Sequence, residues 1–271
     1  MEHAEPQPRS GSSQGLAFAL VLWIIIAVSV LFFFKYGVPE LASDRGSLDS
    51  LYHVILVITG VAYVVVQFLI GLYVWRYSDR EGARASYWHE SDRLEVLWTL
   101  ATAVILVTVV FAGLRLWARV YSPPPADAFV VDVVGSQFQW DMRYPGPDGV
   151  FGRVKPELIS VENLLGLDKT DPAALDDIVR TNQLVLPVNR PALLRLRSKD
   201  MQHSFFLPNF RVKQDLVPGM TLNTWFVPTK VGEYEIACAE LCGLGHYRMR
   251  GLLQVMEPAE VNRWLAEQAA Q

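Results

Sequence analysis

Cysteine is scarce in this chain: of its 271 residues, only Cys238 and Cys242 are cysteines. One pair spaced four positions apart cannot build the disulfide framework on which small secreted domains rely. The sequence also has no C-x-x-C-H pattern, so it carries no covalently attached c-type haem of its own. Any chemical or structural role of cysteine in this protein therefore belongs to this one pair.

The chain also lacks a net positive charge. The chain has 24 Lys and Arg against 28 Asp and Glu, which gives a formal net charge of −4. From residue 123 onward the acidic residues outnumber the basic ones by 18 to 15. This balance argues against nucleic acid as a partner and is compatible with a basic protein partner.

Charged residues are absent from three long apolar runs in the first 120 residues. The runs contain 20, 26 and 19 residues and cover Gly15–Phe34, Ser50–Trp75 and Val96–Leu114. Each is long enough to cross a hydrocarbon core of about 30 Å as a helix. The first run exceeds the roughly 7–15 apolar residues of a signal peptide, and no small-residue cleavage site follows it. We therefore predict three retained spans, at about 15–36, 50–75 and 95–117, within a membrane region covering 15–120.

Basic residues between the second and third runs predict the orientation. Four arginines lie there: Arg76, Arg80, Arg84 and Arg93. Because short basic loops stay on the cytoplasmic side, this loop is predicted to be cytoplasmic. The polar, flexible tail 1–14 is then cytoplasmic too, and everything after residue 120 lies outside.

The part after residue 120 reads as a linker, 121–127, followed by a β-domain over 128–271 with a C-terminal helix. Phe129–Tyr144 is rich in valine and aromatic residues with partial alternation, which predicts a strand. Shorter strands are predicted at Gln183–Pro187, Ala192–Ser198, His203–Leu207, Leu222–Val227, Glu233–Cys238 and Gly251–Met256, separated by turn residues. Pro145–Thr181 is an irregular insertion with a short helix near Asp171–Val179, and Pro258–Ala270 is a terminal helix. This pattern is typical of a sandwich or a Greek-key barrel.

Both cysteines lie in the pattern C-x-E-x-C-x-x-x-H-x-x-M, and a further imidazole is available on a predicted strand. The potential ligands are Cys238, Cys242, His246, Met249 and His203. Two thiolates, imidazole and a thioether suit copper or zinc far better than magnesium or calcium. A disulfide or a tetrahedral Cys2His2 zinc site remains an alternative. Copper is favoured because zinc has no use for Met249, and a second cysteine allows two copper ions to share bridging thiolates.

Several motifs recur in one order and together resemble the cytochrome c oxidase subunit II family from about Leu51 to the end of the chain. They are Glu95-x-x-Trp98-Thr99, Gln137-Phe138-Gln139-Trp140, Lys199-Asp200-Met201-Gln202-His203-Ser204, Lys213-Gln214-Asp215-Leu216-Val217-Pro218-Gly219 and the cysteine loop. The resemblance implies transmembrane helices, here three, followed by an all-β, cupredoxin-like Greek-key barrel. It also implies a multi-pass protein of a bacterial inner membrane, with the barrel on the extracytoplasmic side.

The resemblance assigns roles to individual residues. It implies a binuclear copper centre, CuA, bound by the side chains of His203, Cys238, Cys242, His246 and Met249 and by the backbone carbonyl of Glu240. The carboxylate of Glu240 would bind a magnesium or manganese ion shared with subunit I, since carboxylates suit hard cations. Glu95 would mark the cytoplasmic entrance of a proton path; the competing interpretation is a capping box formed by Asp92 and Glu95.

The function implied by the resemblance is electron entry. Electrons would pass from a c-type cytochrome through the copper centre to haem in subunit I, where haem and CuB reduce dioxygen with proton translocation. No catalytic residue is then expected in this chain. Phe138 and Trp140 alternate onto one strand face, so both are predicted at the docking surface, with Asp141, Asp148 and Glu157 as docking charges. Implied partners are subunit I, subunit III and the cytochrome, which in one bacterial branch belongs to an alternative complex III supercomplex.

The chain departs from the family pattern in three features. The chain has an extra span in front of the usual two, Gly219-Met220 stands where many members have Gly-Arg, and Phe138 replaces the tryptophan proposed for electron entry. Two alternatives stay open at this point. One is a CuA-bearing subunit of a nitric oxide reductase, and the other is a membrane-tethered β-domain held by structural zinc or a disulfide.

Overall fold

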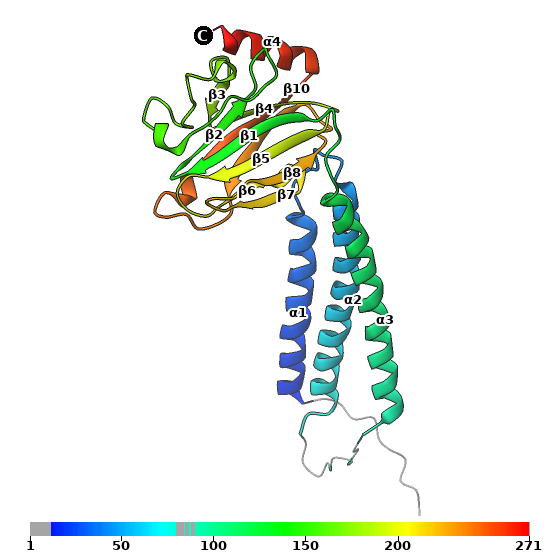
Figure 1. The fold of residues 1–271 in the computed structure, drawn as a ribbon. Helices are drawn as coiled ribbons and strands as arrows, with labels where there is room; N and C mark the ends of the chain where they lie inside the picture. Colours follow the sequence, from blue (N-terminus) through cyan, green and yellow to red (C-terminus); the bar gives the residue numbers. More distant parts are fainter. Residues whose placement is uncertain (1–11, 80–83, 85–86, 88–89, 271) are drawn as a thin grey trace, which may run out of the picture. The chain divides into compact units, whose positions relative to one another are not determined.

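A computed structural model describes residues 12–79, 84, 87 and 90–270 (Figure 1). It divides the chain into two compact units. The first comprises the residues up to Val38 together with Asp49–Arg115, and the second comprises Pro39–Leu48 together with the residues from Leu116 onward. The predicted fold class, three apolar helices followed by an all-β domain, is confirmed.

The three helices are α1 (Ser13–Lys35), α2 (Gly46–Arg76) and α3 (Asp92–Val120). With 23, 31 and 29 residues, each is long and apolar enough to cross a membrane. Few of their side chains are buried within the protein, as expected where lipid surrounds apolar helices. The hydroxyl of Ser12 accepts a hydrogen bond from the amide of Gly15 and caps α1. Most of the predicted tail, residues 1–11, and Arg80 of the basic loop lie outside the described residues.

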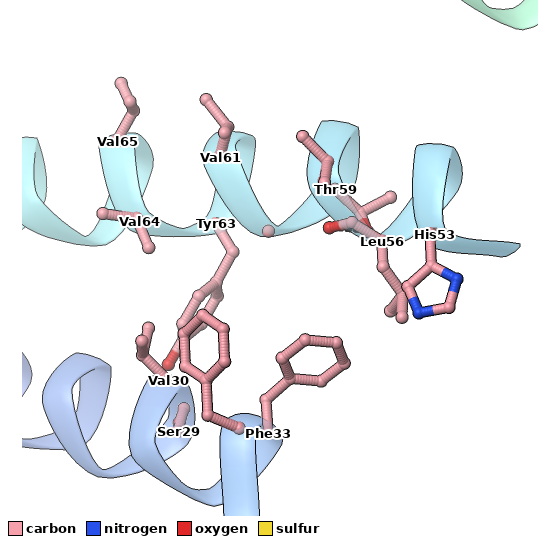
Figure 2. A pocket seen from close by; sticks show the side chains of 13 residues that line it. Ser29, Val30, Phe33, His53, Leu56, Thr59, Val61, Tyr63, Val64 and Val65 are labelled. Atoms are coloured by element: carbon pink, nitrogen blue, oxygen red, sulfur yellow. Dashed lines mark hydrogen bonds between the residues drawn. The ribbon is translucent and has the colours of Figure 1, made fainter. Parts of the chain in front are cut away.

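Helix α1 packs against α2 within the first unit. The ring of Trp23 stacks on Phe68 with ring centroids 5.3 Å apart. Gly71 permits this approach, because a Cβ there would lie 2.8 Å from the Trp23 ring nitrogen. Towards the end of α1 the same two helices border an apolar groove of about 630 Å³, which side chains including Phe33 and Tyr63 line (Figure 2).

The second unit is a sandwich of two five-stranded sheets. The first sheet has the order β3-β2-β1-β5-β8, with β1 (Phe129–Ser136), β2 (Gln139–Tyr144), β3 (Ile178–Thr181), β5 (Ala192–Ser198) and β8 (Leu222–Phe226). The second has the order β4-β10-β9-β6-β7, with β4 (Gln183–Pro187), β6 (His203–Leu207), β7 (Val212–Leu216), β9 (Gly232–Cys238) and β10 (Arg250–Met256). The pairs β1–β5 and β4–β10 are parallel, and the others are antiparallel.

Several strand predictions match closely, and others need correction. The bounds of β4, β5 and β6 are those predicted. Phe129–Tyr144 is two strands, because Gln137 and Phe138 form a turn between β1 and β2. The short helix predicted near Asp171–Val179 is only a 3-10 turn, Pro172–Ala174, and Ile178 already belongs to β3. Strand β3, inside the supposed irregular insertion, and β7 were not predicted.

The core lies between the sheets. Alternation along β2 directs Trp140, Met142 and Tyr144 into it, and all three are fully buried. Facing them are large apolar side chains of the second sheet, among them Phe205 and Leu253. The terminal helix α4 (Pro258–Ala269) closes one edge, with the ring of Trp264 5.3 Å from that of Tyr144.

The connection between α1 and α2 folds as part of the β-unit. The amide of Ala42 donates to the carbonyl of Asn209 (2.7 Å). The guanidinium of Arg45 donates to the carbonyls of Arg211 (3.0 Å) and Trp225 (2.8 Å). These backbone carbonyls gain partners that they would otherwise have to find in water. Pro39–Leu48 is therefore a structural segment of the β-unit rather than a free linker.

Candidate metal centre

The cysteine loop joins β9 to β10 and is closed at its base. The amide of Cys238, the last residue of β9, donates to the carbonyl of Met249 (3.2 Å). The next amide, of Ala239, donates to the carbonyl of Ser204 on β6 (2.9 Å). Because His203 begins β6, these bonds bring the loop and this distant histidine together.

The loop gathers sulfur and nitrogen donors around the two cysteines. The sulfur atoms of Cys238 and Cys242 are 3.8 Å apart, and both residues are free thiols, whereas a disulfide bond measures about 2.05 Å. Nδ1 of His203 lies 4.0 Å from the Cys238 sulfur. Nδ1 of His246 lies 3.7 Å from the Cys242 sulfur, and the Met249 sulfur lies 3.6 Å from it.

The donors spread along both ends of the cysteine pair. His203, Cys238 and Cys242 place one ligand atom each within 4.8 Å of one another, and among the described residues His246 does not belong to that group. A tetrahedral zinc site with ligand distances of about 2.0–2.3 Å would hold all four donors within roughly 4 Å of one another. The backbone carbonyl of Glu240 adds an oxygen 3.2 Å from the Cys238 sulfur. The arrangement therefore fits two soft ions sharing two thiolates better than one zinc ion.

The pKa values of the two thiols indicate that both can be ionised together only when a cation is bound. Burial raises the pKa of Cys238, but hydrogen bonds from His203 and the backbone outweigh burial and lower this pKa below that of a free thiol. Burial raises the pKa of Cys242, and the adjacent Cys238 raises it further. Two neighbouring thiolates repel each other, so a bound metal cation is what would stabilise both in ionised form.

Asp200 orients the histidine, a role that sequence reasoning missed. Nε2 of His203 lies 2.8 Å from the carboxylate of Asp200, which leaves Nδ1 directed at the Cys238 sulfur. The amides of Gln137 and Met201 each donate to this carboxylate at 2.7 Å. Burial opposes protonation of His203, but its bonds to Cys238 and Asp200 raise its pKa. A carboxylate holding the second nitrogen of a ligand histidine is a common arrangement, and its signal here was an Asp three residues before His203.

The prediction that Trp140 lies at a docking surface is wrong. Trp140 is fully buried, and its ring packs edge-on against those of His203 (centroids 6.0 Å apart) and Phe205 (5.2 Å). Phe138 precedes β2 in the turn and is only partly buried. Its ring covers the cysteine loop, because a Cβ on Gly245 would lie 2.5 Å from it.

Of the three predicted docking charges, one is buried and two are exposed. Asp141 has no exposed side-chain surface and pairs with Lys199 at 3.1 Å, so it cannot serve as a docking charge. Asp148 and Glu157 are exposed. The insertion covers the outer face of β2, which is why a residue predicted to face solvent is buried.

Glu95 lies one position too far into α3 for the proposed capping box. The helix begins at Asp92, and the amide of Glu95 donates to the carbonyl of Ser91 (3.0 Å), a regular helical bond. A capping box would place the glutamate at the third helical position, not the fourth. The side chain of Glu95 is exposed, and Glu240 in the cysteine loop is half-buried.

Two family models match the chain. Residues 41–116 match the transmembrane domain of cytochrome c oxidase subunit II, and residues 129–256 match its periplasmic domain. The first match covers α2 and α3 up to residue 116, and α1 precedes it.

Curated relatives carry the same description. The chain is 37% identical over 256 residues to the alternative cytochrome c oxidase subunit 2 of Bradyrhizobium diazoefficiens, covering 93% of this chain and 92% of that protein. It is 29% identical over 226 residues to cytochrome c oxidase subunit 2 of Cereibacter sphaeroides, covering 79% and 73%. Among solved structures, the periplasmic domain of subunit II of cytochrome oxidase from Bradyrhizobium japonicum matches with 30% identity and a TM-score of 0.40, covering 54% of this chain and 96% of that one.

Proposed function

This chain belongs to the cytochrome c oxidase subunit II family, and from that premise we propose that its β-domain binds a binuclear copper centre, CuA, and is the electron entry point of the oxidase. The observation that carries the proposal is the convergence of three further side-chain donors and one backbone carbonyl around two cysteines whose sulfur atoms are 3.8 Å apart. As a subunit II, the chain is part of a membrane haem-copper oxidase. Its own β-domain corresponds to the family's periplasmic domain and lies outside the cytoplasm.

Each ligand has a distinct part. Cys238 and Cys242 would share their thiolates between both ions, with His203 at one end and His246 at the other. Met249 would act as the weak thioether ligand that copper sites recruit, and Glu240 would contribute its carbonyl. Bound copper supplies a carrier that accepts and releases one electron with little change of geometry.

The other residues of the site position these ligands and exclude water. Asp200 holds the imidazole of His203 so that Nδ1 faces the thiolates. Gln137 donates its side-chain amide to the carbonyl of Cys242 (2.8 Å), which holds the loop. Cys242 and Met249 are buried, so solvent has little access to that end of the site. Ligands fixed before and after electron transfer favour a fast reaction.

Electron entry is proposed at Phe138, with Trp140 behind it in contact with His203 rather than at the surface. Asp148 and Glu157 are the exposed carboxylates that would attract a basic c-type cytochrome. Around the site, Leu241, Leu244 and Tyr247 are 73%, 97% and 80% exposed. Apolar side chains exposed to this degree indicate a surface that a protein partner covers.

Further parts of the assembly are proposed from the family alone. The partner would be subunit I, holding haem and CuB, with subunit III and a cytochrome donor that can belong to an alternative complex III. The carboxylate of Glu240 would bind magnesium or manganese at the contact with subunit I, and Glu95 would receive protons at the cytoplasmic side. The boundaries 15–120, 121–127 and 128–271 remain our proposed domain limits along the chain, although the segment Pro39–Leu48 folds with the β-unit.

The decisive experiment measures copper and its electron-spin signal in the purified oxidase. The unsubstituted chain should hold two copper ions sharing one electron in the mixed-valence state. Cys238→Ser or Cys242→Ser should abolish this signal, because either change removes a bridging thiolate. Met249→Leu, the matched control, should retain copper and mainly shift the potential, since a thioether is a weak ligand. One zinc per chain, or a delocalised signal that survives either serine substitution, would refute the proposal.

A further inference from the structure

A second cluster of charged side chains lies on the outer face of the first sheet, away from the cysteine loop. In the register of the sheet, Asp132 on β1 pairs with Arg143 on β2 and with Arg195 on β5. Their side chains project from the same face, together with Arg197 two residues along β5. The carboxylate of Asp132 lies 3.2 Å from Arg143, 2.5 Å from Arg195 and 3.0 Å from Arg197.

The cluster has more positive charge than its carboxylates neutralise. Besides Asp132, only Asp177 forms an ion pair with any of the three arginines in the described residues, at 3.3 Å from Arg143. Three guanidinium groups therefore face two carboxylates, which leaves one net positive charge. Burial lowers the pKa of Arg143, the attraction to Asp132 and Asp177 opposes this effect, and the repulsion from Arg197 and Arg195 adds to it.

Two donors in the cluster lack an acceptor. The side chain of Arg143 is only 3% exposed, and its Nε has no hydrogen-bond partner within the described part of the chain. The buried Nε of Arg197 likewise has no hydrogen-bond partner among the described residues. An unsatisfied buried donor typically costs about 1–3 kcal/mol, and more when the group is charged. Oδ1 of Asp177 is also buried without a partner in the described part of the chain, so the cluster has an acceptor that neither Nε reaches as well as a surplus of positive charge.

These side chains open into a cavity of about 340 Å³. Its lining includes Asp132 and the three arginines, together with Phe151 and Gly152. The volume falls within the range of roughly 300–1,000 Å³ that is usual for small-molecule sites. Two of the lining arginines are still partly accessible, since Arg195 and Arg197 are 34% and 29% exposed.

The arginines are held in place before any ligand arrives. The guanidinium carbons of Arg143 and Arg195 lie over the ring of Phe151, 4.8 and 4.3 Å from its centroid. Arg143 also donates to the carbonyl of Gly152 (3.0 Å), whose amide in turn donates to Asp177 (3.0 Å). Side chains fixed in this way lose little conformational entropy on binding a ligand.

We propose that this pocket binds a phosphate group, free or carried by a small soluble molecule. Guanidinium groups bind phosphate and carboxylate oxygens through paired, charge-assisted hydrogen bonds. Phosphate is favoured because its several oxygens can serve more of the converging arginines than the two of a carboxylate. Arg153 adds little attraction, since Asp168 (3.7 Å) and Asp171 (3.2 Å) already pair with it. None of the pocket residues is a copper ligand, so this site is independent of the proposed electron transfer.

The test is a titration of the purified, full-length oxidase with inorganic phosphate at constant ionic strength. Phosphorus-31 line widths should show saturable binding at one site per chain. Arg197→Gln removes one guanidinium and should weaken phosphate binding at least about tenfold, the effect of losing a charge-assisted hydrogen bond. Arg263→Gln, the matched control on α4, should leave the affinity unchanged.

Two results would overturn the proposal: no saturable binding to the unsubstituted oxidase, or equal affinity in Arg197→Gln. The copper spectrum of each variant checks that the β-domain is folded. If Arg197→Gln fails that check, Arg197→Lys decides, because lysine keeps the charge but lacks the planar fork. A several-fold loss of affinity in Arg197→Lys supports the pocket, and an unchanged affinity contradicts it.

Discussion

Gly245 is the position at which the cysteine loop meets the turn that carries Phe138. Any side chain on Gly245 would collide with the aromatic ring, since even a Cβ would lie 2.5 Å from it. Gly243 has φ +116°, a backbone conformation that favours glycine, and it lies beside both Gln137 and Phe138. Phe138 therefore touches the loop that carries Cys242 and His246, which links a partly exposed ring to the proposed copper ligands.

Phe138→Leu should slow electron uptake from the cytochrome several-fold without altering the copper spectrum. Leucine fills much of the space over Gly245 and preserves packing, but it removes the aromatic ring from the proposed route. Stopped-flow reduction of the copper centre by the donor measures the effect. Phe206→Leu on β6, another partly buried phenylalanine, is the control and should react normally. An unchanged rate in Phe138→Leu would return this residue to a purely packing role.

Glu95→Gln should lower oxidase turnover several-fold if Glu95 receives protons, because glutamine cannot ionise. Copper content and the rate of copper reduction should stay normal, since the substitution lies in α3 rather than in the β-domain. Asp92→Asn removes an exposed carboxylate from the same helical turn and should have little effect on turnover. Oxygen consumption by the purified complex measures both variants. Full turnover in assembled Glu95→Gln enzyme would exclude the proton-entry role.

At the scale of elements, Asp141 connects three parts of the β-domain. Its fully buried carboxylate on β2 accepts hydrogen bonds from Thr181 on β3 (2.9 Å) and from Gln139 (2.9 Å). Lys199, which follows β5, pairs with it at 3.1 Å and also donates to the carbonyl of Leu164 in the insertion. One ion pair thus holds the insertion, β2 and the segment leading to His203.

Lys199→Met should lower the stability of the β-domain by about 3 kcal/mol, because it leaves a buried carboxylate without its cation. The double variant Lys199→Met, Asp141→Asn should recover much of this loss, since no uncompensated charge remains. Thermal loss of the copper absorption measures the midpoint for each variant. Lys230→Met is the control: because its pair with Glu40 is exposed, its loss should change the midpoint little. Equal midpoints for Lys199→Met and Lys230→Met would contradict the assigned role.

At the scale of the whole molecule, orientation follows from charge and length. Arg84 lies between α2 and α3, Arg76 ends α2 and Arg93 lies in the first turn of α3, whereas the family's periplasmic domain follows α3. Short arginine-rich loops remain in the cytoplasm, and a large domain after the last span is translocated. The two ends of α3 must then face opposite sides of the membrane.

Cysteine labelling tests this orientation directly. A membrane-impermeant maleimide should label Arg84→Cys in inside-out vesicles but not in right-side-out vesicles. Val161→Cys, at an 87% exposed position of the β-unit, should show the reverse pattern and serves as the matched control. The unsubstituted chain corrects for any labelling of Cys238 and Cys242. Labelling of Arg84→Cys from the outside would invert the predicted topology.

Local patterns in the sequence determined most of the elements and the identity of the candidate ligands. Apolar runs of 19 to 26 residues allow little besides helices that cross a membrane, because the bilayer satisfies no backbone hydrogen bonds. Turn residues on both sides of β4, β5 and β6 limit each strand, which explains why their predicted bounds agree with the structure. Soft donors at short spacings on one loop are recognisable because a loop of that length keeps them close together.

Only the tertiary structure decided which faces are covered and which distant residues meet. Alternation assigns Asp141 and Trp140 to opposite faces of β2, but it cannot reveal that the insertion buries the outer face as well. For this reason Asp141 is buried although it points away from the core that holds Trp140, and the arginines around Asp132 line a pocket. The parallel pairing of β1 with β5 brings Asp132 beside Arg195, 63 positions along the chain. Such long-range contacts depend on the order of strands in the sheets, which local periodicity does not encode.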